Sequence, residues 1–211
     1  MKIKKIECCV LLTSVLLSGI IILSSCKKEN TKNSDNGSYY YTATIGGVQY
    51  SQKATEINGY EAGSAIGGSD DVTFSATINP KDYPYPAEST TMDITKGMFH
   101  NYFDATNEQF KAFFPPGVTN FTSGPEYDPF KFGDGFIIEW FDENDVDWST
   151  AAGTGDQTNS MIKIVSVKES PSIVEYYLEV KLQFSCKLYN SNTGEMKQLT
   201  NGEFVGLFGK F

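Results

Sequence analysis

One run of alternating residues, from Val174 to Leu188, constrains the fold more than any other feature of the chain. Its even positions are all apolar, and its odd positions are mostly polar. A period of two over eight repeats indicates an extended strand with one buried face, because a helix would spread the apolar residues around its circumference. At about 3.3 Å per residue the strand would be roughly 50 Å long if straight. It must therefore bend or pass from one sheet layer into another.

The rest of the chain has the character of an all-β domain. Aromatic residues are abundant, turn residues recur at short intervals, and no long apolar helical pattern is present. We predict an antiparallel β-sandwich with one short helix, built from residues 39–211 as a single domain. A closed antiparallel β-barrel is the alternative. Besides the long run, we expect strands at 39–45, 48–51, 72–78, 136–141, 161–167 and 204–211.

Short motifs predict where the chain turns. Gly46-Gly47 joins two alternating runs and predicts a two-residue hairpin, and Asn201-Gly202 gives the strongest hairpin signal in the chain. The one helix candidate is 106–114, where Thr106 and Gln109 fit a capping box. Such a short helix is stable only when packed, so we expect it to cover an open end of the sheet.

The N-terminus has the pattern of a targeting segment. Lysines at positions 2, 4 and 5 precede an apolar stretch that is too short to span a bilayer comfortably. It ends in Leu23-Ser24-Ser25-Cys26, which resembles the lipobox of bacterial lipoproteins. That resemblance implies removal of residues 1–25 and lipidation of Cys26. With two or more acyl chains, the protein would be firmly anchored to a membrane.

Residues 26–38 combine the expected lipid site with a tether. The segment after Cys26 has no apolar residue, so we expect it to be flexible. Lys27 follows the cysteine where an Asp would imply inner-membrane retention. By analogy with bacterial lipoproteins, this indicates lipid anchoring in the outer membrane of a Gram-negative cell, on the periplasmic or the surface side.

Several pieces of the second half are similar to a group of small Gram-negative outer-membrane lipoproteins. They are 148–150, 155–157, 184–189 and 199–204. The resemblance covers about the last 80 residues and implies a location and a β architecture. It implies no activity.

Charge and residue usage exclude some functions. The net charge is −9 and the chain contains no arginine, whereas nucleic-acid binders need a basic face. His100 is the only histidine, so a His-based zinc site is not expected. Cys186 lies on the apolar side of the long strand, which predicts a buried, unreactive thiol.

The turn at 142–147 is the densest cluster of potential ligand groups. Asp142, Asp145 and Asp147 lie between the only two tryptophans, Trp140 and Trp148. Aromatic rings beside carboxylates are typical of a glycan-binding patch, provided that a ring is exposed. The alternative is that both indoles are core residues. The acids could also bind calcium outside an EF-hand, act as a glycosidase pair, or simply form a solvated turn.

The sequence therefore favours a membrane-anchored envelope lipoprotein with a non-catalytic binding or structural β module. Glycan is the leading ligand class, another envelope protein is a further possible partner, and no cofactor is required. A glycoside hydrolase that uses the acidic turn is one alternative. A fimbrial or surface-assembly subunit is another, although the absence of arginine excludes maturation by cleavage at arginine.

Overall fold

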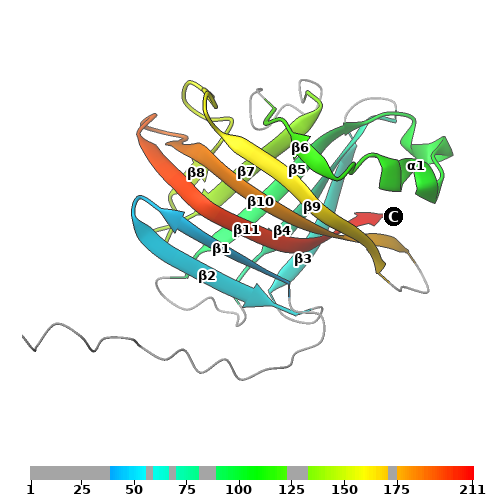
Figure 1. Cartoon of the computed structure of the whole chain (residues 1–211), viewed down its shortest axis with the longest axis horizontal. Helices are drawn as coiled ribbons and strands as arrows, with labels where there is room; N and C mark the ends of the chain where they lie inside the picture. Colours follow the sequence, from blue (N-terminus) through cyan, green and yellow to red (C-terminus); the bar gives the residue numbers. More distant parts are fainter. Residues whose placement is uncertain (1–38, 56–58, 67–69, 81–88, 123–132, 171–174) are drawn as a thin grey trace, which may run out of the picture. The chain divides into compact units, whose positions relative to one another are not determined.

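The long alternating run forms the central strand of a curled antiparallel sheet (Figure 1). The computed structural model describes residues 39–55, 59–66, 70–80, 89–122, 133–170 and 175–211. The predicted signal segment, Cys26 and the tether lie outside the described residues. All described residues fall within one compact unit, 36–211.

The described elements are mostly strands. In chain order they are β1 (Tyr39–Ile45), β2 (Val48–Ala54), β3 (Tyr60–Ile66), β4 (Val72–Ile78), β5 (Thr91–Phe99), the 3₁₀-helix η1 (Tyr102–Asp104), α1 (Asn107–Ala112), β6 (Gly117–Thr119), β7 (Gly135–Phe141), β8 (Asp147–Ser149), β9 (Met161–Ser170), β10 (Tyr176–Asn190) and β11 (Met196–Lys210).

The strand order shows how β10 connects two layers. The sheet runs β2-β1-β11-β10-β8-β7-β5-β4-β3, and β9 pairs with both β10 and β6. Along one edge β10 pairs with β11, and along the other it pairs first with β9 and then, at Tyr189 and Asn190, with β8. In Figure 1, β2, β1, β11, β10 and β9 form the front layer, and β8, β7, β5, β4 and β3 lie behind them. The long strand therefore carries the sheet from one layer into the other.

The all-β antiparallel prediction is confirmed, and the architecture lies between the sandwich and the barrel. The two layers belong to one continuous sheet, and β3 and β4 pack close to β11. At one such contact, a Cβ atom at Gly206 would lie 3.2 Å from that of Ala76. The end strands β2 and β3 form no ladder with each other among the described residues, so the sheet is open there.

The predicted register of β10 is also confirmed. Its even positions from Leu178 to Leu188 are all buried in the core between the layers. Aromatic side chains from both layers complete this core, including Tyr41, Phe74, Phe136, Trp140, Phe204 and Phe208.

The predicted helix covers one end of the core. Thr106 and Gln109 form the expected capping box at the start of α1. Phe110 is fully buried, and its ring lies 4.7 Å from Phe74 of β4, 6.0 Å from Phe99 of β5 and 6.2 Å from Tyr176 of β10. The helix therefore contacts strands of both layers, as its dependence on packing predicted.

One predicted hairpin is wrong. Gly46-Gly47 forms the expected turn between β1 and β2, with positive φ at both residues. Asn201-Gly202, however, lies inside the continuous strand β11, where Asn201 has φ 53° and the ladder to β10 shifts register between Phe184 and Cys186. The dipeptide therefore forms a β-bulge, which accommodates the same positive φ without reversing the chain.

Candidate functional site

The acidic turn is the tip of the β7–β8 hairpin. Trp140 and Trp148 are directly opposite each other in its ladder, so the structure brings the two tryptophans together. Asp142 follows β7, and its backbone N–H bonds the carbonyl of Val146 to close the turn. The acidic turn therefore connects two paired strands.

Asp142 holds this hairpin together from inside. Its Oδ1 accepts hydrogen bonds from the backbone N–H groups of Asn144 (2.9 Å) and Val146 (3.1 Å), and its Oδ2 accepts one from Trp148 Nε1 (3.0 Å). Lys197 Nζ lies 3.5 Å from Oδ2. Burial alone would raise the pKa of Asp142, but these hydrogen bonds and the charge of Lys197 outweigh it, so the pKa is lowered. The carboxylate is ionised and fully engaged.

Both tryptophans are core residues, which removes the stacking surface that the glycan hypothesis requires at this turn. Trp140 is 0% exposed and Trp148 is 5% exposed. The Tyr50 ring packs edge-on against Trp140 at 4.9 Å, and Lys197 Nζ lies 3.8 Å from the centre of the Trp148 ring. Residues of β2 and β11 therefore contact the two rings, and neither ring offers a face to a ligand.

The other acids of the turn do not complete a metal or catalytic site. Asp145 is exposed with φ 57°, and Asp147 Oδ2 accepts a 2.7 Å hydrogen bond from Ser191 Oγ. Within the described part of the chain, no group of three or more Asp, Glu, His or Cys residues is placed to hold a metal ion. A glycosidase acid needs a raised pKa, whereas that of Asp142 is lowered. The geometry thus gives no support to calcium binding or glycosidase chemistry at this turn.

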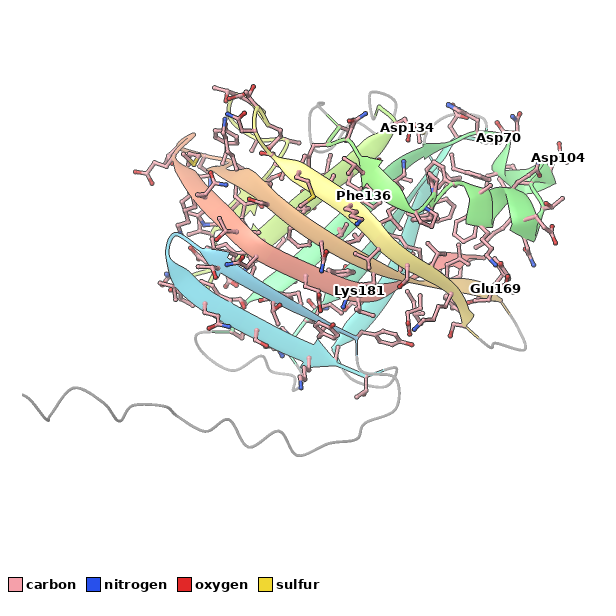
Figure 2. All side chains as sticks on the ribbon, viewed as in Figure 1. Asp70, Asp104, Asp134, Phe136, Glu169 and Lys181 are labelled. Carbon is pink, nitrogen blue, oxygen red and sulfur yellow. The ribbon has the colours of Figure 1, made fainter. Side chains whose placement is uncertain are left out.

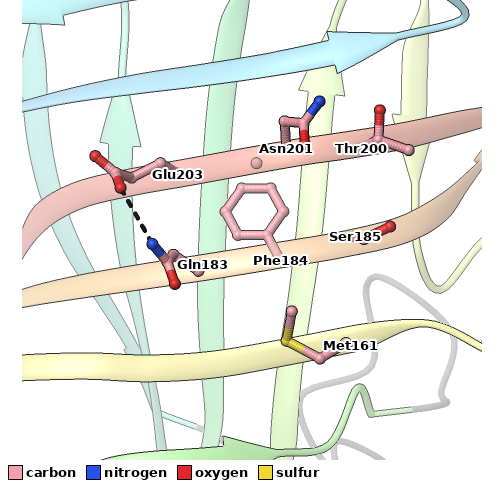
Figure 3. Close-up of a pocket in the computed structure, with 8 residues that line it drawn as sticks. Met161, Gln183, Phe184, Ser185, Thr200, Asn201 and Glu203 are labelled. Carbon is pink, nitrogen blue, oxygen red and sulfur yellow. Dashed lines mark hydrogen bonds between the residues drawn. The ribbon is translucent and has the colours of Figure 1, made fainter.

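A different feature lies on the outer face of the front layer. An open depression of about 560 Å³ lies over β9, β10 and β11 (Figure 3). Polar and apolar groups both line it, and the lining residues are Met161, Gln183, Phe184, Ser185, Thr200, Asn201, Gly202 and Glu203.

The β-bulge creates this depression. Ser185 lies at the register shift, so Thr200 and Asn201 both lie opposite this one residue of β10. The left-handed backbone at Asn201 accompanies this change and leaves its side chain exposed. Gly202, directly opposite Phe184, has no side chain, and a Cβ atom there would overlap the Phe184 ring. The ring therefore fills the space beside the glycine on the core side of the sheet.

Glu203 is the charged group of the depression. Its carboxylate accepts hydrogen bonds from Tyr40 Oη and, at 3.4 Å, from Gln183 Nε2, and it pairs with Lys181 Nζ at 2.9 Å. Lys181 lies on the front layer over β10 and β11 (Figure 2). The hydrogen bond from Tyr40, aided by Lys181 and Gln183, lowers the pKa of Glu203 against the opposing effect of burial.

Three lining side chains have unused hydrogen-bonding capacity. Among the described residues, the side chains of Thr200 and Asn201 make no hydrogen bond, and Gln183 uses only its amide nitrogen. Sequence analysis missed this site because its residues come from separate strands. The one available signal was the Asn-Gly pair, which predicted a turn.

Comparisons with protein-family models, with curated proteins and with solved structures found no match. The fold and site define an all-β protein with one curled antiparallel sheet and an open depression on its outer face. In the described part of the chain, no helix has the length and apolar character needed to cross a membrane. The resemblance to Gram-negative lipoproteins stays a prediction.

Proposed function

We propose that this protein is a lipid-anchored lipoprotein of the Gram-negative outer membrane whose β domain is a non-catalytic binding module. The observation that carries the proposal is the sequence Leu23-Ser24-Ser25-Cys26, with a basic, apolar leader before it. Twelve polar or glycine residues separate Cys26 from Tyr39, where β1 begins. This arrangement suits a domain that works close to a membrane while remaining free to meet a ligand.

The carboxylates of the described sites support binding over hydrolysis. Most glycosidases need two carboxyl groups that face the same bond, one of them with a raised pKa. The depression is lined by one carboxylate, Glu203, whose pKa is lowered, and Asp142 is fixed inside the hairpin. Neither group therefore has the raised pKa that a glycosidase acid needs.

Metabolic labelling with palmitate tests the anchor. The wild-type chain should incorporate label and sediment with the outer membrane, and Cys26→Ala should lose the label and leave an uncleaved or soluble form. Cys186→Ala is the matched control, because Cys186 is a buried free thiol of β10, and this variant should stay labelled. Continued labelling of Cys26→Ala would show that the lipoprotein assignment is wrong.

Incubation with oligosaccharides tests the absence of catalysis. If the domain only binds, the sugar should be recovered intact after prolonged incubation with the purified protein. Release of new reducing ends that disappears in Asp142→Asn or Asp145→Asn would instead establish a hydrolase at the acidic turn.

A further inference from the structure

We propose that the depression over β9, β10 and β11 is a binding site for a neutral saccharide, an inference that rests on the proposed binding function and names its ligand. The juxtaposition that carries it is two amides, a hydroxyl and an ionised carboxylate around an open hollow with an apolar wall. This places the glycan site away from the tryptophans, on the opposite side of the β10–β11 pair from the core.

The free groups match the hydroxyls of a sugar ring. An amide side chain presents a donor and an acceptor side by side, and neighbouring sugar hydroxyls present the same combination. Asn201 offers both groups, and Gln183 offers its carbonyl oxygen while its nitrogen holds Glu203. Thr200 adds a hydroxyl that can donate or accept.

Glu203 is arranged as a fixed acceptor. Tyr40 and Lys181 hold its carboxylate in place, so a ligand hydroxyl would meet an ionised group that needs little reorganisation. The pairing with Lys181 offsets the charge of Glu203, so the site presents hydrogen-bonding groups and no net charge to a ligand. The site therefore favours uncharged sugars over sulfated or carboxylated ones.

Met161 supplies the apolar wall. Its side chain lies on β9 across from Ser185 and is 41% exposed. The C–H groups of a pyranose could pack against this thioether. The depression is open and would desolvate only one side of a sugar, so we expect affinities in the millimolar range, of order −4 kcal/mol.

The position of the depression within the sheet argues against a peptide ligand. A peptide commonly binds a sheet by adding a strand to an unpaired edge. Here β10 is paired with β9 and β11, and β11 is paired with β10 and β1. The backbone groups beneath the depression are therefore already used, and recognition must come from side chains.

Saturation-transfer NMR on the full lipidated protein tests the proposal. The detergent should be an amine oxide, because sugar-headed detergents would compete for the site. The probes are neutral gluco-, galacto-, manno- and xylo-oligosaccharides and chitin fragments, with a heparin fragment and a mixed tetrapeptide as comparators. The variants are Gln183→Ala and Asn201→Gly, which keeps the positive φ of 53° accessible. Gln49→Ala, an exposed glutamine of β2, is the matched control.

At least one neutral oligosaccharide should give transfer signals, weakened about five-fold or more by each site variant and unchanged by Gln49→Ala. Equal melting temperatures would show that the variants are folded. The proposal is overturned if no neutral sugar binds, if binding survives both site substitutions, or if only the heparin fragment or the peptide binds. If the wild-type protein is labelled with palmitate but binds no sugar, this inference is wrong and the proposed anchor stands. If it binds sugar but carries no palmitate, the proposed anchor is wrong and this inference stands.

Discussion

The indole Nε1 of Trp148 donates a 3.0 Å hydrogen bond to Oδ2 of Asp142, six residues earlier in the chain. This contact keeps both the indole of Trp148 and the carboxylate of Asp142 inside the hairpin. The acidic cluster that sequence analysis proposed as a ligand site therefore stabilises the β7–β8 hairpin.

Replacing Asp142 should therefore affect stability. Asp142→Asn keeps the shape but puts an NH₂ group where an acceptor is needed, and leaves a buried donor unsatisfied. We expect a loss of about 1–3 kcal/mol in the free energy of unfolding near neutral pH. Asp145→Asn is the control, because Asp145 is exposed in the same turn, and it should change stability by less than about 0.5 kcal/mol. Urea titration of both variants provides the comparison.

The pH dependence of the same variants has a defined sign. Because the folded-state pKa of Asp142 is below its ordinary value of 3.8, the folded state binds its proton less readily than the unfolded state. Its stabilising contribution is fully present above the unfolded pKa and is lost as pH falls through the folded pKa. The difference in unfolding free energy between wild type and Asp142→Asn should therefore shrink as the pH falls from about 6 to about 2. A difference that grows on acidification would contradict a lowered pKa for Asp142.

Substitutions on the two faces of β10 should have very different effects on stability. Leu182 and Phe184 are buried, so Leu182→Ala should cost about 2–5 kcal/mol and Phe184→Ala about 3–5 kcal/mol. Lys181 faces outward and pairs with Glu203 at 2.9 Å, and Lys181→Ala should cost at most about 1 kcal/mol. Equal losses at Lys181 and Leu182 in a denaturant titration would mean that both faces of β10 are covered.

The bulge in β11 predicts an unusual tolerance at Asn201. Its φ of 53° lies in the left-handed region, so Asn201→Gly should be tolerated, whereas the β-branched Asn201→Val should cost about 1–3 kcal/mol. In a regular strand the order would be reversed, since valine favours strands and glycine weakens them. Thermal unfolding of the two variants decides between these geometries.

The buried charge of Lys96 should reduce the stability of the folded state. It is buried on the core side of β5, where it pairs with Asp134 and lies 4.3 Å from the centre of the Phe113 ring. Burial lowers its pKa from the ordinary 10.5, against the opposing effect of Asp134. Lys96→Met, of similar shape, should therefore be at least as stable as wild type near neutral pH.

The sign of the Lys96 effect with pH follows from the same shift. Because the folded-state pKa is below 10.5, the unfolded state binds more protons between the two pKa values, and wild-type stability rises with pH in that range. The difference between wild type and Lys96→Met should move in favour of wild type between about pH 8 and about pH 10. Asp134→Asn removes the charge that opposes the shift, so the pKa of Lys96 should fall further. In this variant the rise in stability with pH should begin at lower pH.

Local patterns in the sequence determined most of the individual elements. The period of two fixed both the existence and the buried face of β10, because strand alternation depends only on which side faces the core. The Gly46-Gly47 turn and the capping box of α1 followed from backbone and hydrogen-bonding preferences of a few adjacent residues. β5 escaped prediction because Lys96 interrupts its apolar positions, and that buried lysine has partners in Asp134, Phe113 and the carbonyl of Gly97.

Tertiary structure alone decided the site. A positive φ at Asn201 suits either a hairpin or a bulge, and pairing of β11 with both β1 and β10 selects the bulge. The tryptophans could have been exposed or buried, and Tyr50 and Lys197, far away in sequence, determine that they are covered. The depression joins β9, β10 and β11 across their outer face. Such a surface depends on register and curvature, which no local pattern of residues specifies.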